Sequence, residues 1–342
     1  MRSISYRARI RWKKGIQICL LLLGLLLLLV ALTVVYLGRF VVYTPDGVRL
    51  DFDRDSSRDI PTQSGLPTVT TPPERVEIEF ADPDPRGQSS QPVSGWYVDL
   101  EMLQNPAAVL QALQELSAPC TVLVDLKGGN GSFYYTTAID GARVADIDTK
   151  TVDTVISYLR NHGFTMIARI RSFQDSYFAE QHNSCALQTA SGALWVSSGF
   201  YWLDPANETV LAYLKQIARE LAAKGFEEIV FDDFRFPNGT QIVYNSNKER
   251  SELIADVAKD LLNFFSSSNI TISFGNPAAD FSLPSGSRVY LSGVTGTGIS
   301  AAIRSYAQLD DPQSQLIFLT SSKDNRFDSY QVLRPLLNRV IQ

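Results

Sequence analysis

The chain has 342 residues, of which 45% are hydrophobic and 20% charged, and its formal net charge is −5. This length suits one large domain, or two small domains with appendages. Without an excess of Lys and Arg, the chain lacks the charge pattern by which proteins bind nucleic acid or an anionic lipid surface.

The first feature in chain order is an almost uninterrupted apolar run at residues 16–37. As a helix it would be roughly 33 Å long, enough to cross the ~30 Å hydrocarbon layer of a membrane. The run is longer than the core of a cleavable signal peptide and no A-x-A-like cleavage site follows it, so we expect a retained anchor, with cleavage as the alternative.

The tail before this run, residues 1–15, contains six basic residues and no acidic one. Such a tail is expected to stay in the cytoplasm, which places everything after the anchor outside the cell membrane. Removing those six from the 31 Lys and Arg leaves 25 against 36 Asp and Glu, a net charge of −11 for the remainder.

Two short regions separate the predicted anchor from the main domain. Residues 38–52 alternate in hydropathy around a Thr-Pro-Asp-Gly centre, which predicts a juxtamembrane hairpin. Residues 53–94 are rich in Pro, Ser, Thr, Asp and Arg and predict a stalk, within which only residues 76–80 alternate like a strand.

From residue 95 to residue 342, strand-like and helix-like segments alternate. Apolar, β-branched runs predict seven strands, at 96–100, 121–126, 164–170, 228–231, 270–274, 288–291 and 316–320. Helical periodicity predicts helices at 106–117, 151–161, 205–224, 248–265 and 329–341. Alternation of this kind and length predicts an α/β fold, a (β/α) TIM-type barrel. Because only seven strands are predicted, the barrel is either incomplete or uses residues 76–80 as its missing strand.

One αβ unit has clear local signals. Asp204 is expected to be the N-cap of a long helix with Pro205 at its first position, and Gly225 ends that helix. The strand after it runs directly into Asp232, Asp233 and Arg235. In a (β/α) barrel, the carboxyl ends of the strands and the loops after them form the active face.

Other predicted strands also end in charged residues. The second ends at Asp125 and Lys127, and the third at Arg169 and Arg171 followed by Asp175. Strand ends carry charge for solubility alone, and we prefer that explanation for Asp99, Glu101 and Lys127 on local grounds. Arg169 and Arg171 are two residues apart, so they share a face of their strand and can pair with a carboxylate on its neighbour or contact substrate.

Asp232 and Asp233 are consecutive, so in a regular strand their side chains point to opposite faces. We expect Asp232 to face the barrel axis, although a bulge would reverse the choice. Glycoside hydrolysis needs two carboxyl groups across the scissile bond, and Asp125 is the best partner for Asp232. The fifth and sixth strands end in SFGNP and LSGVTG, which supply no acid.

The loop after the third strand carries Trp195 and Trp202, with Phe200 and Tyr201 between them. Such rings can stack on sugars, but aromatic residues in a long loop more often pack that loop down. The two histidines lack ligand spacing, so no metal site and no cofactor are expected. Cys120 and Cys185 are predicted to lie at opposite ends of a parallel sheet and therefore to be free thiols.

Residues 168–237 resemble the glycoside-hydrolase domain family of bacterial exported proteins, a TIM-barrel family akin to the α-amylase superfamily. The matching motifs are ARIRSFQD, WLDP and GFEEIVFDDFRFP, with a weaker match at VLVDLKGGNG. The resemblance implies a sugar-active site in which Asp232 is the favoured catalytic carboxylate, Asp125 lines the groove, and Arg169 and Arg235 position the substrate or the acids. Asp233 stands where the family usually has Tyr, and downstream of these motifs the match fails.

The leading hypothesis is a single-pass, membrane-anchored extracytoplasmic barrel that hydrolyses a cell-envelope or environmental polysaccharide, with Asp232 and Asp125 as its catalytic carboxylates. A catalytically degenerate barrel that binds glycan or scaffolds envelope proteins is the alternative, and a purely structural ectodomain without an open groove is a third. The residues predicted to contact substrate are Lys127, Arg169, Arg171, Asp175, Trp195, Trp202, Asp233 and Arg235.

Overall fold

A computed structural model describes residues 41–44, 47–50, 93–278 and 283–337 of the chain. The chain divides into two units, residues 1–79 and 80–342. In the first unit, strands β1 (Val41–Thr44) and β2 (Gly47–Leu50) pair antiparallel, as the turn-rich centre between them predicts.

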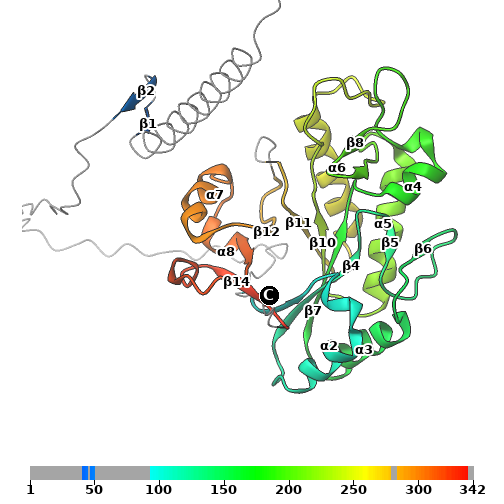
Figure 1. Ribbon diagram of the computed structural model, residues 1–342, viewed down its shortest axis with the longest axis vertical. Coiled ribbons are helices and arrows are strands. Elements are labelled where there is room, and N and C mark those ends of the chain that lie inside the picture. Colours follow the sequence, from blue (N-terminus) through cyan, green and yellow to red (C-terminus); the bar gives the residue numbers. More distant parts are fainter. Residues whose placement is uncertain (1–40, 45–46, 51–92, 279–282, 338–342) are drawn as a thin grey trace, which may run out of the picture. The chain divides into compact units, whose positions relative to one another are not determined.

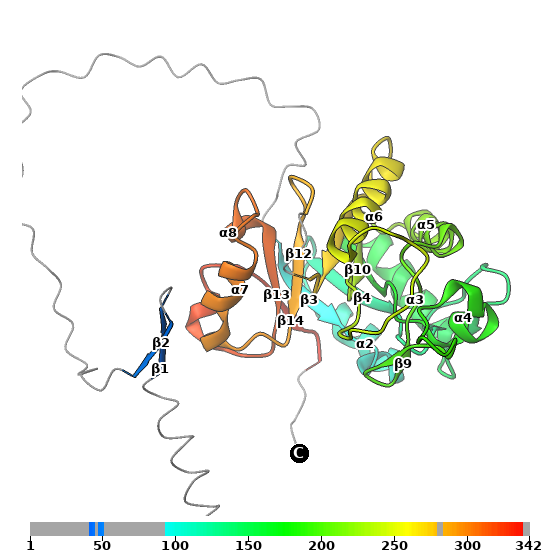
Figure 2. The same cartoon turned by 90° about the horizontal axis from the view of Figure 1, so that it is seen from above.

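Eight parallel strands of the second unit form a closed barrel (Figures 1 and 2). Each pairs with the next in chain order, and the last pairs with the first. The barrel strands are β3 (Ser94–Val98), β4 (Thr121–Lys127), β7 (Thr165–Arg171), β10 (Glu228–Asp232), β11 (Thr271–Gly275), β12 (Val289–Ser292), β13 (Leu316–Leu319) and β14 (Gln331–Pro335).

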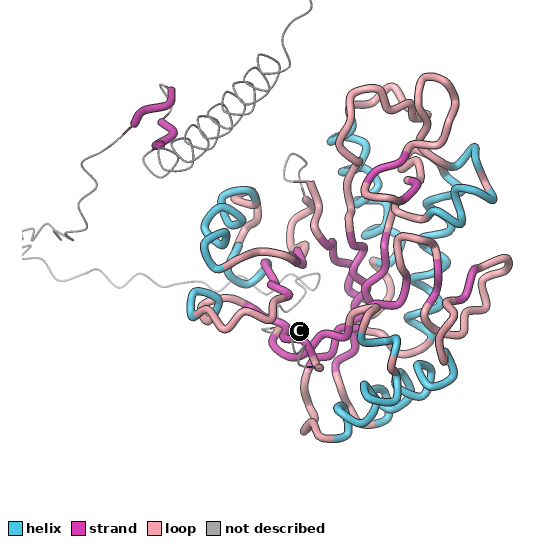
Figure 3. The backbone as a smooth tube through the Cα atoms, in the orientation of Figure 1, coloured by secondary structure: helices cyan, strands magenta, loops and turns pink. Residues whose placement is uncertain are grey.

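Helices outside these strands complete the α/β units. They are α2 (Pro106–Gln114), α3 (Thr149–Asn161), α4 (Ser176–Gln181), α5 (Glu208–Ala223), α6 (Arg250–Phe265), α7 (Ile299–Ser305) and α8 (Pro312–Gln315). Long connections follow β4, β7 and β10 (Figure 3). The one after β4 contains the short strands β5 (Ser132–Phe133) and β6 (Arg143–Val144), and the one after β7 contains β8 (Val196–Ser197) and β9 (Phe200–Tyr201). The fold therefore places its longest loops on the face where a TIM barrel carries its site.

Strand alternation sorts the apolar side chains into two layers. Val122 and Val124 of β4 belong to the large cluster that also contains the buried side chains of α3, so they point outward to the helices. Leu123 between them packs with Ile167 and Val230, in a cluster built almost wholly from strand residues. This inner cluster is the barrel interior. The same alternation along each strand points Asp125, Arg169 and Asp232 toward the barrel axis near the carboxyl ends of their strands.

The predicted C-terminal helix at 329–341 is wrong. Gln331–Pro335 is the strand β14, which pairs with β13 on one side and with β3 on the other. This strand supplies the eighth position, so the barrel is complete without residues 76–80, which lie outside the described part of the chain. Pairing with a neighbouring strand on each side stabilises this segment as a strand despite its local helical periodicity.

The predicted start of the long helix is also wrong, by three residues. Helix α5 begins at Glu208, with Asn207 as its N-cap. The Asp204 carboxylate instead accepts hydrogen bonds from the backbone N–H groups of Ala206 and Asn245, at 2.9 and 2.7 Å. The helix ends before Gly225, whose φ of +106° suits glycine, as predicted.

Cys120 and Cys185 are free thiols, as predicted. Among the described residues, no helix is both long and apolar enough to cross a membrane, and the predicted transmembrane segment 16–37 lies outside them.

Candidate active site

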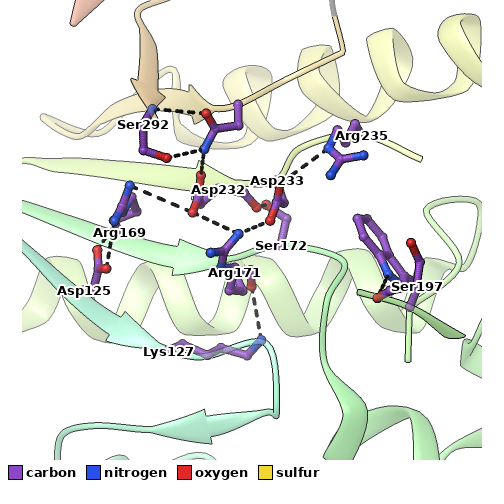
Figure 4. A network of polar contacts seen from close by, with 12 residues as sticks. Asp125, Lys127, Arg169, Arg171, Ser172, Ser197, Asp232, Asp233, Arg235 and Ser292 are labelled. Carbon is purple, nitrogen blue, oxygen red and sulfur yellow. Dashed lines mark hydrogen bonds and ion pairs between the residues drawn. The ribbon is translucent and has the colours of Figure 1, made fainter. Parts of the chain in front are cut away.

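Three neighbouring strands bring the candidate residues together at the carboxyl end of the barrel. In the β4–β7 pair Asp125 stands opposite Arg169, and in the β7–β10 pair Arg171 stands opposite Asp232. Strand register alone therefore places an aspartate beside each arginine. Figure 4 shows the resulting network of alternating carboxylates and guanidinium groups.

Asp125 and Arg169 form a two-pronged ion pair. Arg169 Nε donates to Asp125 Oδ1 at 2.6 Å, and Arg169 Nη2 donates to Asp125 Oδ2 at 2.8 Å. Both residues are only 9% exposed. Burial raises the pKa of Asp125 above its ordinary value, and Arg169 opposes that rise. Burial also works against the charge of Arg169, but the Asp125 and Asp232 carboxylates outweigh it and raise the arginine pKa.

Asp232 is 2% exposed and is held from both sides. Its Oδ1 accepts a hydrogen bond from Asn276 Nδ2 at 2.9 Å, while its Oδ2 lies 3.3 Å from Arg171 Nη1 and 4.0 Å from Arg169 Nη1. Gly275 leaves room for this carboxylate, because a Cβ there would lie 2.4 Å from Asp232 Oδ1. The cationic and amide donors around it therefore fix the orientation of this side chain.

Asn276 and Ser292 belong to this site although sequence reasoning did not select them. Asn276 Nδ2 donates to Ser292 Oγ at 3.0 Å, and the Ser292 backbone N–H donates to Asn276 Oδ1 at 3.1 Å. Asn276 follows β11 and Ser292 ends β12, the two strands that were set aside because they end without an acid. The signal in the sequence was the polar residue at each strand end, in SFGNP and LSGVTG.

Asp233 does not point away from Asp232, which corrects the prediction from strand alternation. Its φ of +48° takes it out of the strand conformation. Its carboxylate contacts Arg171 Nη1, the same nitrogen that lies near Asp232, and its other oxygen is 3.4 Å from Arg235 Nε. Both carboxylates therefore face one guanidinium at the mouth of the barrel.

Lys127 and Asp175 do not reach the open face. Their side chains are fully buried and form an ion pair of 2.8 Å. Lys127 Nζ also donates to the Arg171 carbonyl oxygen, and Asp175 accepts from Tyr213 and caps α4. The predicted substrate contact of these two residues is unsupported, because they hold the loop after β7 onto the barrel.

The two tryptophans pack their loop rather than form an exposed stacking platform. Trp202 is 0% exposed and donates from Nε1 to the Ser197 carbonyl oxygen at 3.2 Å. Trp195 is half-buried and lies against Gly239, where a Cβ would be 2.4 Å from the Trp195 ring. For these residues the packing alternative raised in the sequence analysis holds.

The two candidate catalytic carboxylates lie close enough to act on one bond. They are linked through Arg169 by contacts of 2.6 and 4.0 Å. Because the nitrogens of one guanidinium are only ~2.3 Å apart, the nearest oxygens of Asp125 and Asp232 lie at most about 9 Å apart. Glycosidase carboxyl pairs are separated by ~5–5.5 Å or ~6.5–9.5 Å, so this limit is compatible with such a pair. Among the described residues, no group of three or more His, Cys, Asp or Glu side chains is arranged to hold a metal ion.

Comparison with solved structures gives partial matches. A hypothetical protein from Ruminiclostridium thermocellum is 26% identical, with 52% of this chain and 96% of that chain covered and a TM-score of 0.43. An α-galactosidase from Lactobacillus brevis is 10% identical over 72% of this chain, with a TM-score of 0.48, and one from Thermus thermophilus is 16% identical over 54%, with a TM-score of 0.41. The chain spans 37% and 38% of the length of these two enzymes. No curated protein matches the chain.

Comparison with protein families identifies the barrel. A family described as "Putative glycosyl hydrolase domain" matches residues 95–274, which run from within β3 to within β11 and include Asp125, Arg169 and Asp232. The match covers more than half of the chain, so the protein belongs to this family of glycosyl hydrolase domains.

Proposed function

We propose that the protein is a membrane-anchored, extracytoplasmic glycoside hydrolase that acts on a cell-envelope or environmental polysaccharide. The observation that carries this proposal is Asp232, a fixed carboxylate at the carboxyl end of the fourth barrel strand, within about 9 Å of a second carboxyl group. Membership of a glycosyl hydrolase domain family supports the same reaction class.

The surroundings of the two carboxyl groups suit different roles. Asp232 lies beside Arg171 and accepts from Asn276, so it is held in position to stabilise or attack the positively charged sugar centre. Burial raises the pKa of Asp125, which suits a proton donor to the leaving-group oxygen. This chemistry uses two carboxyl groups and needs no metal or cofactor.

One observation favours the alternative function, a barrel that binds glycan, or scaffolds envelope proteins, without cleaving a glycan. Both oxygens of Asp125 already accept from Arg169, so proton donation requires one of these hydrogen bonds to be displaced. In the described chain, Asn276 follows β11 and Ser292 ends β12, so neither strand presents an acid at this position. If substrate does not open the ion pair, the site binds and does not cleave.

The test compares glycan cleavage by the full-length chain in neutral detergent with cleavage by Asp232→Asn. Release of new reducing ends is measured on a panel of envelope and plant polysaccharides, and glycan binding is measured in parallel. The control is Asp146→Asn, at an exposed position. We expect Asp232→Asn to abolish cleavage while the control retains it. Binding without cleavage by the unmodified chain supports the alternative, and activity that survives Asp232→Asn refutes the assignment.

The predicted anchor and topology support the proposed location. Residues 16–37 are long enough to span a membrane, and the six basic residues before them favour a cytoplasmic N-terminus. The net charge of −11 beyond that tail disfavours nucleic acid as a partner. Protease added to intact spheroplasts should digest the barrel, and a barrel protected until the membrane is permeabilised would contradict this location.

A further inference from the structure

A hollow lies beside the candidate active site, along the loop that follows β10. It is a cavity of about 500 Å³, lined by the loop residues 235–240, by the first turn of α6 and by Ala278 after β11. This volume is within the range of small-ligand sites. Among the described residues that line it, Arg235 and Arg250 are the only charged ones.

Arg250 is held in a fixed orientation in this cavity. Its Nη1 donates to the Gly239 carbonyl oxygen at 2.6 Å, and its guanidinium lies 5.6 Å from the ring centre of Phe236 and 6.0 Å from that of Tyr244. No carboxylate of the described chain lies within ion-pair distance of it, and Nε and Nη2 have no acceptor there. A guanidinium over aromatic rings still offers its in-plane N–H groups to an oxyanion.

Arg235 connects the cavity to the carboxylates. Its guanidinium lies 5.4 Å from the Trp202 ring, and its Nε is 3.4 Å from Asp233, whose other oxygen is already paired with Arg171. Figure 4 shows Arg235 joined to Asp233 by this single contact. The single carboxylate of Asp233 is therefore shared between two arginines, and the terminal N–H groups of Arg235 can donate to a further acceptor.

The charged side chains that line the cavity are of one sign. Arg235 and Arg250 line it with no Asp or Glu among the described lining residues, and the Asp233 carboxylate that Arg235 contacts is also paired with Arg171. A neutral sugar would leave the Arg250 guanidinium without a counterion, whereas an oxyanion would form an ion pair with it.

We propose that this cavity is a subsite for an acidic sugar unit, one that carries a carboxylate or a phosphate. The inference rests on the proposed function and names its substrate class: an anionic polysaccharide, whose charged unit occupies the Arg235–Arg250 cavity while the adjoining unit lies over Asp232. Arg250 supplies in-plane N–H donors to the oxyanion, and Arg235 binds it from the side of the active site.

Isothermal titration of the full-length chain in neutral detergent tests this proposal. The probes are trigalacturonate against its methyl ester, galactose 6-phosphate against galactose, and inorganic phosphate. The first pair tests a carboxylate, the second a sugar phosphate, and the last an oxyanion without a sugar. The variants are Arg250→Gln and Arg250→Lys. The matched control is Arg219→Gln, because Arg219 also lies over an aromatic ring, 4.3 Å from that of Phe264, but does not line the cavity.

We expect at least one anionic probe to bind about tenfold or more tightly than its neutral partner, with the preference shrinking as salt is added. Arg250→Gln should remove that preference, Arg250→Lys should keep part of it, and Arg219→Gln should keep all of it. If Arg250→Gln weakens none of the anionic probes, the subsite is refuted. That result leaves the proposed function standing when Asp232→Asn still abolishes cleavage of a neutral glycan. If no glycan of either kind is bound or cleaved, both proposals fail.

Discussion

Replacing Arg169 by Met tests the energetic basis of the site. The substitution leaves Asp125 buried without its partner. Arg169 and Asp125 are each 9% exposed and are joined by hydrogen bonds of 2.6 and 2.8 Å, so they form a buried pair. Loss of one member of such a pair costs about 3–5 kcal/mol in the free energy of unfolding.

The cost should depend on pH in a defined direction. Burial already raises the pKa of Asp125 and Arg169 opposes that rise, so the pKa in the folded variant moves further above the ordinary value of 3.8. The unfolded carboxyl keeps the ordinary value. At pH values between the unfolded and the folded pKa of Asp125, folding is accompanied by uptake of a proton. The free energy of unfolding therefore falls as pH rises through that range. The deficit of the variant should therefore be smaller at pH 5 than at pH 8.

Urea unfolding followed by tryptophan fluorescence at both pH values measures the effect. Arg304→Met, at an exposed position on α7, is the control and should change the free energy of unfolding by less than about 0.5 kcal/mol. The double variant Asp125→Leu/Arg169→Met should recover most of the loss, because it leaves no unpaired charge. A deficit below about 1 kcal/mol, or one that is the same at pH 5 and pH 8, would refute the reasoning.

Three further substitutions probe the surroundings. Gly275→Ala should displace the Asp232 carboxylate and cost about 1–3 kcal/mol in stability, with a larger relative loss of glycan cleavage; unchanged activity in a reducing-end assay would contradict the close contact. Asn276→Asp keeps the size of the side chain but sets a like charge against Asp232, so cleavage should fall about tenfold or more at neutral pH and recover partly on acidification, as a pH–rate profile would show. Lys127→Met should cost about 3–5 kcal/mol in thermal or urea unfolding by leaving Asp175 unpaired, whereas a loss of glycan affinity with unchanged stability would restore Lys127 as a substrate contact.

Much of the barrel could be predicted from sequence because its strands are buried on both faces. Parallel strands of this kind read as short apolar runs, and β4, β7 and β10 are found within one residue of their predicted bounds. The period of two along those strands then selects Asp125, Arg169 and Asp232 as inward-facing residues. The local sequence pattern was sufficient to predict a strand where the helices on either side of it have clear helical periodicity.

The missed features depend on contacts between distant segments. Asp204 was expected to cap a helix, but the backbone N–H of Asn245 in another loop occupies its carboxylate. Asn276 carries no charge, and its importance arises only because β11 lies beside β10 and brings its amide to Asp232. The turn at Asp233 was likewise invisible to a rule that assumes regular strand geometry up to the last residue.

The pairing of β14 with β3 has a consequence for the order in which the barrel is completed. Gly95 pairs with Leu333, and the Val93 N–H donates to Gln331 Oε1 across 238 residues of sequence. One edge of β3 therefore stays unpaired during synthesis until β14 has emerged, and an open strand edge can pair with other chains. Ribosome-bound or truncated chains that lack β14 should consequently be more prone to aggregation and proteolysis than the closed barrel.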